Sequence, residues 1–160
     1  MLLHLVRHAD AGDPAAWTGP DSARPLSDKG RAQADRLGIF LADHDVKTDA
    51  LIASPKLRAL QTAEIVAGHL GASVTTDDRL GDPLDLATLD AVLTDAGNPD
   101  RPILFGHDPD FSEFVAELCS ASNVPMRKGA LAKIEVDRPL QTAGGTLRWL
   151  IPPDALRRKG

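Results

Sequence analysis

The chain has 160 residues, enough for one domain with a genuine hydrophobic core and too few for two of ordinary size. Hydrophobic residues make up 42% of it, which excludes a disordered chain, and the net charge of -5 argues against a general nucleic-acid binder. No apolar stretch approaches 20 residues, no signal-peptide pattern is present, and the lone Cys119 cannot form an internal disulfide. We therefore expect one cytoplasmic domain over residues 1–160, with no membrane and no nucleic-acid partner.

The first predicted element is a strand over residues 2–6, whose continuous apolar run is typical of a strand buried on both faces. Arg7 and His8 follow at its carboxyl end, where open α/β sheets bind ligands.

A loop rich in Asp, Gly and Pro spans residues 11–25 and carries Trp17. It either folds over the ligand crevice as a partial lid or leaves Trp17 as an exposed or packing aromatic. Ser27 is the predicted N-cap of the helix that follows, which has Ala34, Leu37 and Leu41 on one stripe.

A short strand over residues 50–53 comes next. Ser54 and Pro55 are predicted as the N-cap and first residue of a second helix, with Arg58 in its first turn. The core stripe of that helix is Ala59, Ala63, Val66 and Leu70, so Arg58 is free to face the crevice.

The rest of the chain continues the alternation of strands and helices. A weak strand over residues 73–76, a charged loop over 77–83 and a helix with Leu86, Leu89 and Leu93 precede a buried strand over 102–105. His107 follows that strand, before a helix with Phe111, Phe114, Val115 and Leu118 on its apolar face. The pattern predicts a three-layer α/β/α fold with a mostly parallel central sheet.

Period-two alternation marks two closing strands, one with Ala132, Ile134 and Val136 and one with Leu147, Trp149 and Ile151. We expect them to form an antiparallel hairpin at one edge of the sheet.

Four side chains from three of these elements predict a cationic phosphate pocket: Arg7, His8, Arg58 and His107. Two guanidinium groups can bind phosphate oxygens in a bidentate way. One neutral imidazole can attack phosphorus while the other donates a hydrogen bond to the developing charge.

These residues resemble the three signatures of the histidine phosphatase superfamily, also called phosphoglycerate-mutase-like. Arg7-His8-Ala9-Asp10, the segment at residues 54–63 and Gly106-His107-Asp108-Pro109 occur in family order. The resemblance implies a phosphatase with a covalent phosphohistidine intermediate on His8, whose phosphate is bound by Arg7, Arg58 and His107. Within the superfamily, PLSDKG, SPKLRALQTA and GHDPDF are most similar to the SixA-like phosphohistidine phosphatases.

Two positions depart from the family pattern. Ala9 stands where Gly is usual, and its methyl group would restrict the backbone if a positive φ were needed there. Asp82 stands where many members place a glutamate proton donor, and it either donates the proton or simply caps the helix after Pro83.

The predicted reaction needs no metal and no cofactor, because two arginines in the pocket would repel a cation. The expected substrate is a phosphohistidine, with a histidine-containing phosphotransfer protein as the candidate partner. Two alternatives stay open: a small-molecule phosphomonoesterase acting on sugar or nucleotide phosphates, and a non-catalytic module that binds phosphohistidine or phosphate.

Overall fold

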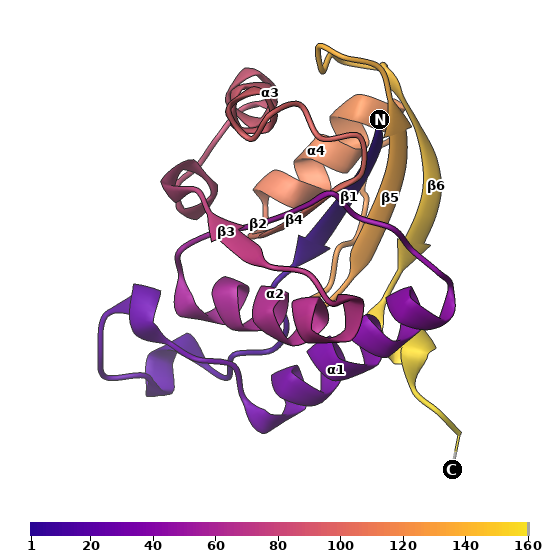
Figure 1. Ribbon diagram of the computed structural model, residues 1–160. Coiled ribbons are helices and arrows are strands. Elements are labelled where there is room, and N and C mark those ends of the chain that lie inside the picture. Colours follow the sequence, from indigo (N-terminus) through magenta and orange to yellow (C-terminus); the bar gives the residue numbers. More distant parts are fainter. Residues whose placement is uncertain (160) are drawn as a thin grey trace.

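The structure is a computed structural model that describes residues 1–159, and at its centre is a six-stranded sheet in the order β3-β2-β4-β1-β5-β6 (Figure 1). Strands β1, β4, β2 and β3 run parallel, β5 is antiparallel to β1, and β6 is antiparallel to β5. The mostly parallel sheet with an antiparallel hairpin at one edge is thus confirmed. The strands span Leu2–Arg7 (β1), Ala50–Ala53 (β2), Val74–Thr76 (β3), Pro102–Gly106 (β4), Leu131–Val136 (β5) and Gly145–Ile151 (β6).

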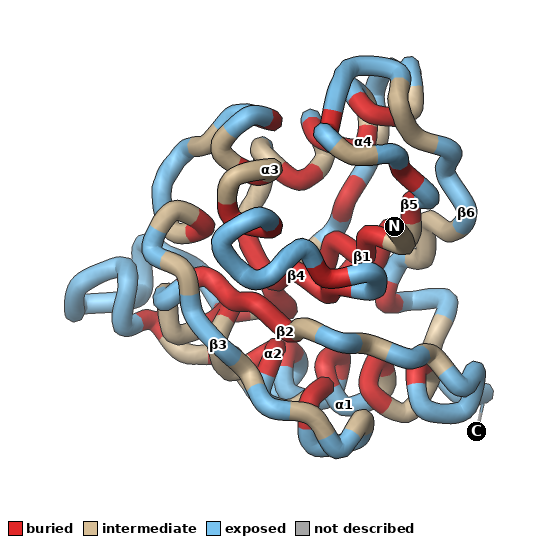
Figure 2. Tube along the Cα trace, turned by 45° about the horizontal axis from the view of Figure 1, so that its top comes forward, coloured by how far each residue is buried: buried red, intermediate tan, exposed pale blue. Residues whose placement is uncertain are grey.

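Two helices cover each face of the sheet, which confirms the three-layer α/β/α fold (Figure 1). Helices α1 (Asp28–Asp43) and α2 (Leu57–Leu70) share one core cluster, while α3 (Leu86–Asp95) and α4 (Asp110–Cys119) share the other. Along β1, Leu3 and Leu5 pack on the side of α3 and α4, and Val6 packs on the side of α1 and α2. Figure 2 shows the resulting burial of β1 and β4 at the centre of the sheet.

The start of α1 is joined closely to the chain that leaves β1. The Ser27 hydroxyl accepts a hydrogen bond from the Gly30 amide at 3.1 Å, so the predicted N-cap is confirmed. A Cβ atom at Gly30 would lie 1.9 Å from the carbonyl oxygen of Asp10. This approach of α1 to the β1 loop therefore requires glycine.

The edge hairpin is less buried than the centre of the sheet. A register shift interrupts the pairing of β5 and β6 between Lys133 and Ile134, and Leu147 on β6 is 38% exposed. Trp149 and Ile151 pack against the core cluster of α1 and α2. Across residues 1–159 we find no helix with the length and hydrophobicity needed to span a membrane.

Candidate active site

The ends of three neighbouring parallel strands bring the predicted pocket residues together. Backbone hydrogen bonds continue one residue past the strands: His8 N–H donates to the Gly106 carbonyl and Ser54 N–H to the Phe105 carbonyl, both at 2.9 Å. His8, Ser54 and the residue after Gly106, which is His107, therefore lie side by side at the carboxyl edge of the sheet. β4 lies between β1 and β2 in the sheet although it follows both in the chain, and such a change of strand order is where α/β sheets form a crevice.

His8 is held as a neutral imidazole with a free lone pair. Its ring is 5% exposed, and Nδ1 lies 2.8 Å from the carbonyl oxygen of Ala9. A carbonyl can only accept, so Nδ1 carries the proton and Nε2 is bare. Burial lowers the His8 pKa to about 4, with further lowering by the charges of Arg58, Arg7 and Lys128. At neutral pH the Nε2 lone pair is therefore available for attack on phosphorus.

The second histidine lies next to the first. The ring centroids of His8 and His107 are 5.2 Å apart, with their planes inclined by 53°. Burial lowers the pKa of His107 to about 3, with added effects of His8 and Arg58. His107 Nε2 lies 2.8 Å from the Ser54 hydroxyl oxygen. Both imidazoles are thus neutral, and one of them has a hydroxyl partner.

Arg58 has one edge of its guanidinium occupied and a donor left over. Its Nη1 donates to the Asp21 carbonyl and its Nη2 to the Asp21 carboxylate, each at 3.0 Å. Nε is buried without a partner among residues 1–159, in a side chain that is 7% exposed. Partial burial opposes ionisation of Asp21, but the hydrogen bond and charge of Arg58 lower its pKa overall. Asp21 is therefore an anion that holds the Arg58 guanidinium in place.

Asp21 places part of the 11–25 loop at the pocket, which the sequence left undecided. Arg24 fastens the loop by donating from Nη1 to the Ala11 carbonyl at 2.8 Å, with Nη2 lying 3.5 Å from the Asp21 carboxylate. Trp17 stays within the loop, since its indole N–H donates to the Pro20 carbonyl at 2.8 Å and its ring is half-exposed. Trp17 therefore binds within its own loop, while the carboxylate of Asp21 accepts a hydrogen bond from Arg58.

Arg7 approaches from the opposite side and is oriented by the chain before β5. Nη1 donates to the Met126 carbonyl at 2.8 Å and lies 3.8 Å from the Asp108 carboxylate. Its Nε is buried and without a partner in the described chain, as in Arg58. Arg7 and Arg58 thus each have a buried N–H donor without a partner in the described chain, a property that they share with Arg24 and Arg36.

One local prediction at this site is wrong. Helix α2 begins at Leu57 with Lys56 as its N-cap, so Ser54 and Pro55 are not its cap and first residue. Ser54 instead lies fully buried at the end of β2, where its hydroxyl accepts from the Lys56 amide at 3.2 Å and meets His107. Tertiary contact with His107 replaces the local capping role. The prediction that Arg58 lies in the first turn of α2 is confirmed.

The alanine that replaces the usual glycine fits without strain. Ala9 is not among the residues with positive φ, so its methyl group meets no backbone penalty. It is fully buried with Leu26 and Ala34, and its amide donates to the Thr62 hydroxyl at 3.1 Å. Ala9 thus packs the backbone next to His8 against α1 and α2.

Asp82 is exposed and makes no hydrogen bond or ion pair within residues 1–159. The alternative in which it caps the following helix is wrong, because Asp85 caps α3 by accepting from the Thr88 amide at 2.8 Å. A Cβ built on the neighbouring Gly81 would lie 3.4 Å from the Ser54 hydroxyl. The residue before Asp82 thus lies close to Ser54, and the role of Asp82 as proton donor stays a prediction.

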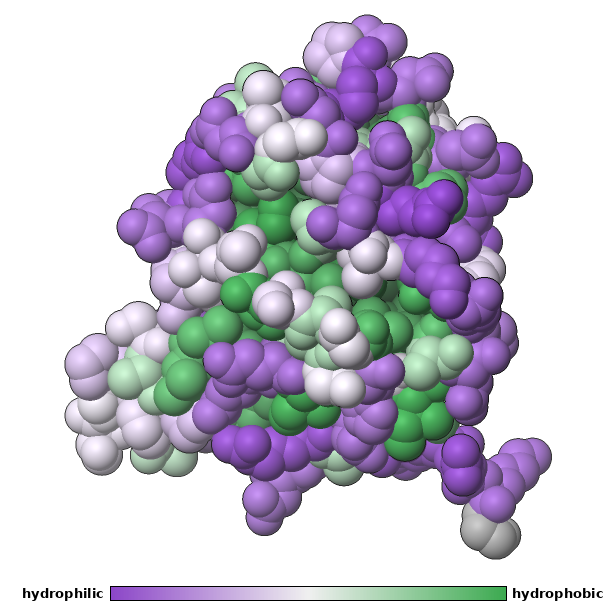
Figure 3. All heavy atoms as spheres, viewed as in Figure 1, coloured by the Kyte–Doolittle hydropathy of each residue, from purple (hydrophilic) through white to green (hydrophobic). Residues whose placement is uncertain are grey.

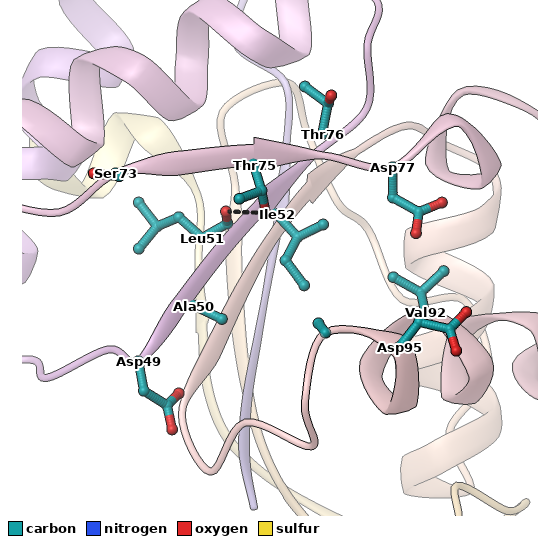
Figure 4. Close-up of a pocket in the computed structure, with 11 residues that line it drawn as sticks. Asp49, Ala50, Leu51, Ile52, Ser73, Thr75, Thr76, Asp77, Val92 and Asp95 are labelled. Carbon is teal, nitrogen blue, oxygen red and sulfur yellow. Dashed lines mark hydrogen bonds between the residues drawn. The ribbon is translucent and has the colours of Figure 1, made fainter.

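A hollow of about 430 Å³ lies elsewhere, between α3 and strands β2 and β3 (Figures 3 and 4). Its carboxylates are already used: Asp49 accepts from two backbone amides, and Asp77 and Asp95 both pair with Arg79. Figure 4 shows apolar side chains such as Ile52 and Val92 between them. Among the described residues, the hollow therefore holds no histidine or arginine and no unpaired carboxylate, unlike the strand ends.

Residues 1–159 also contain no cluster of three or more His, Cys, Asp or Glu residues suited to a metal ion. The groups that converge are instead two guanidinium donors, a bare imidazole nitrogen and a second neutral imidazole. Such a set binds a dianionic phosphoryl group and supplies a nucleophile for it.

Comparisons with known proteins agree with this geometry. A family model described as Histidine phosphatase superfamily (branch 1) matches residues 3–83. Phosphohistidine phosphatase SixA of Escherichia coli (strain K12) is 30% identical over 98% of this chain and 97% of its own. The structure of the protein histidine phosphatase SixA complexed with tungstate has a TM-score of 0.84 and 28% identity, covering 98% of this chain and all of that one.

A shorter similarity links the chain to an enzyme with another substrate. The 8-oxo-(d)GTP phosphatase of Mycolicibacterium smegmatis (strain ATCC 700084 / mc(2)155) is 33% identical over 62% of this chain and 32% of its own. The names of these two relatives state different substrates. From the matched family and the nearly full-length similarity to SixA, this chain belongs to the histidine phosphatase superfamily, branch 1.

Proposed function

We propose that the chain acts as one histidine phosphatase domain that hydrolyses phosphohistidine on a protein, through a phosphorylated His8. The observation that carries this proposal is the 2.8 Å contact between His8 Nδ1 and the Ala9 carbonyl, which requires the proton on Nδ1 and leaves Nε2 with a lone pair. The charges of Arg58 and Arg7, both near enough to lower the His8 pKa, support the phosphate-binding role of both arginines.

In the first step, His8 Nε2 attacks phosphorus in line with the bond to the leaving nitrogen. A P–N bond forms on His8 as the P–N bond of the substrate breaks, and the substrate imidazole leaves with that electron pair and takes a proton from the surrounding water. Arg7 and Arg58 neutralise the equatorial oxygens, and His107 donates a hydrogen bond to them.

In the second step, water attacks the phosphorus of phospho-His8. The new P–O bond forms as the P–N bond to His8 breaks, the attacking water releases a proton to the solvent, and inorganic phosphate leaves. His8 Nε2 regains its lone pair with the electron pair of the broken P–N bond, while Nδ1 keeps its proton and donates it to the Ala9 carbonyl throughout.

The surroundings of Asp82 favour phosphohistidine over an alkyl phosphate. A protonated imidazole is a good leaving group, whereas an alkoxide needs a general acid, which contributes typically ~10² to 10⁴-fold in rate. Asp82, the residue proposed for that role, is exposed and unpaired within residues 1–159. We infer a weak general acid and therefore a preference for the P–N bond.

The partner we propose is a histidine-containing phosphotransfer protein, and we place the reaction in the cytoplasm. The name of the nearly full-length relative, phosphohistidine phosphatase, supports this substrate class. In the described chain β4 leads into α4 with only three residues between them, and the longer 11–25 connection contains two short 3₁₀ turns. These connections hold no helical subdomain that would keep a protein-borne phosphohistidine from the pocket.

The test compares turnover of a histidine-phosphorylated phosphotransfer protein with turnover of sugar and nucleotide phosphomonoesters. We expect a higher kcat/KM for the phosphoprotein, and acid-labile, base-stable labelling of the enzyme after rapid mixing. His8→Ala should abolish both signals. His44→Ala serves as the matched control, since His44 is exposed at the end of α1.

Each other outcome assigns a different function. Preference for a phosphomonoester with labelling of His8 would establish a small-molecule phosphatase. Tight binding of the phosphoprotein with no turnover and no label would establish a binding module. Either result would overturn the proposal.

A further inference from the structure

The hydroxyl of Ser54 lies between one backbone nitrogen and one side-chain nitrogen at the base of the pocket. Its oxygen accepts from the Lys56 amide at 3.2 Å and lies 2.8 Å from Nε2 of His107. Ser54 is fully buried, so water does not reach its hydroxyl proton.

Counting protons decides the direction of the bond between Ser54 and His107. If His107 Nε2 carried a proton, it would donate to Ser54, and the hydroxyl proton would be buried with no acceptor among residues 1–159. If Nε2 is bare, the Ser54 hydroxyl donates to it, and each hydrogen-bonding group has a partner. The second arrangement avoids a buried, unsatisfied donor, which costs about 1–3 kcal/mol.

We infer that Ser54 is a positioning residue that fixes the tautomer of His107, with its ring proton on Nδ1. Nδ1 is the nitrogen that no side chain of the described protein engages, so its N–H is available to a phosphoryl oxygen. His8 and His107 then carry their protons on the same ring atom but present opposite groups to the pocket. His8 offers a lone pair from Nε2, and His107 offers a donor from Nδ1.

The arrangement has a consequence for the reaction, and in this respect the inference rests on the proposed function. A neutral imidazole with the other tautomer would present a lone pair to the phosphoryl oxygens and repel them. By keeping the proton on Nδ1, Ser54 lets His107 donate to the developing negative charge while both histidines remain neutral. His8 can therefore act as the nucleophile and His107 as the hydrogen-bond donor while both imidazoles are uncharged.

The test reads the tautomer directly in the resting enzyme. With histidine labelled by ¹⁵N, two-bond proton–nitrogen correlation spectra at pH 7 distinguish a protonated ring nitrogen from a bare one, and His107→Ala identifies the signals. We expect the protonated signature on Nδ1 of wild-type His107. In Ser54→Ala we expect both nitrogens to shift toward the other tautomer and kcat to fall about tenfold, the loss of one hydrogen bond.

Ser54→Thr keeps a hydroxyl and should restore the wild-type signature. Ser112→Ala is the matched control, since that hydroxyl donates only to the Pro109 carbonyl at 3.0 Å, and it should change neither spectrum nor kcat. A proton on Nε2 in the wild type, or unchanged His107 nitrogens in folded Ser54→Ala, would overturn the inference. The wild-type spectrum, assigned with His107→Ala, needs no substrate, so it stands even if no phosphoenzyme forms and the proposed function fails.

Discussion

The pKa of His8 predicts an enzyme whose nucleophile stays active well below neutral pH. Burial is the main cause, and the charges of Arg58, Arg7 and Lys128 add to it, so that the pKa falls from 6.5 to about 4. At pH 5 a group with a pKa of 4 is about 90% neutral, whereas an ordinary histidine is only about 3% neutral. The nucleophile should therefore be about 30-fold more available at pH 5 than a solvent-exposed imidazole would be.

The assay is a proton–carbon NMR titration of the histidine ring from pH 8 to pH 3.5, with His8→Ala used to identify the signal. The measurement avoids substrate, because a phosphoryl group itself titrates near pH ~6 and would distort a rate profile. A midpoint near 4 is expected. A midpoint near 6.5 would refute the reasoning, since it would mean that at pH 5 only about 3% of His8 has a lone pair available to attack phosphorus.

Three further predictions concern stability and the pocket rim. Burial lowers the pKa values of His4 and His8 to about 4, so as the pH falls below 6.5 these histidines take up protons in the unfolded chain before they do so in the folded one. By pH 4.5 each of the two histidines should therefore lower the free energy of unfolding by about 2.5 kcal/mol. Urea unfolding at pH 7 and pH 4.5 measures this, and equal midpoints would contradict it. Gly30→Ala would place a methyl group 1.9 Å from the Asp10 carbonyl oxygen and should destabilise the fold by about 3 kcal/mol, read from thermal unfolding. Asp82→Asn should lower kcat for an alkyl phosphomonoester by at least about tenfold and leave phosphohistidine turnover within about twofold, and unchanged monoester turnover across pH would end the proton-donor assignment.

The core of the fold was predictable because buried helices and strands have a characteristic spacing of apolar residues along the chain. The strand at β1 was identified from a continuous apolar run, which a strand needs when helices cover both faces. Helices α1 and α4 were identified from apolar residues at helical spacing, and the hairpin of β5 and β6 from period-two alternation. Each of these signals depends only on neighbours in the chain.

The local prediction failed where a residue found a distant partner. Ser54 followed by Pro55 has the composition of a helix start, yet the hydroxyl of Ser54 is bound to His107, which lies 53 positions away in the chain. Asp21 carried no signal within its loop, because its role comes from a hydrogen bond to Arg58, 37 positions away.

The sequence by itself determined the residue types of the pocket and the layers of the fold, since hydrophobic periodicity and the three motifs are local properties. The sequence could not determine which ring nitrogen of each histidine carries the proton, or which group each polar side chain binds. Whether a histidine offers a lone pair or a proton depends on the partner of its other nitrogen, here the Ala9 carbonyl for His8 and the Ser54 hydroxyl for His107. Only the tertiary structure decided these, because strand order places β4 between β1 and β2 and so brings the ends of three separate segments into contact.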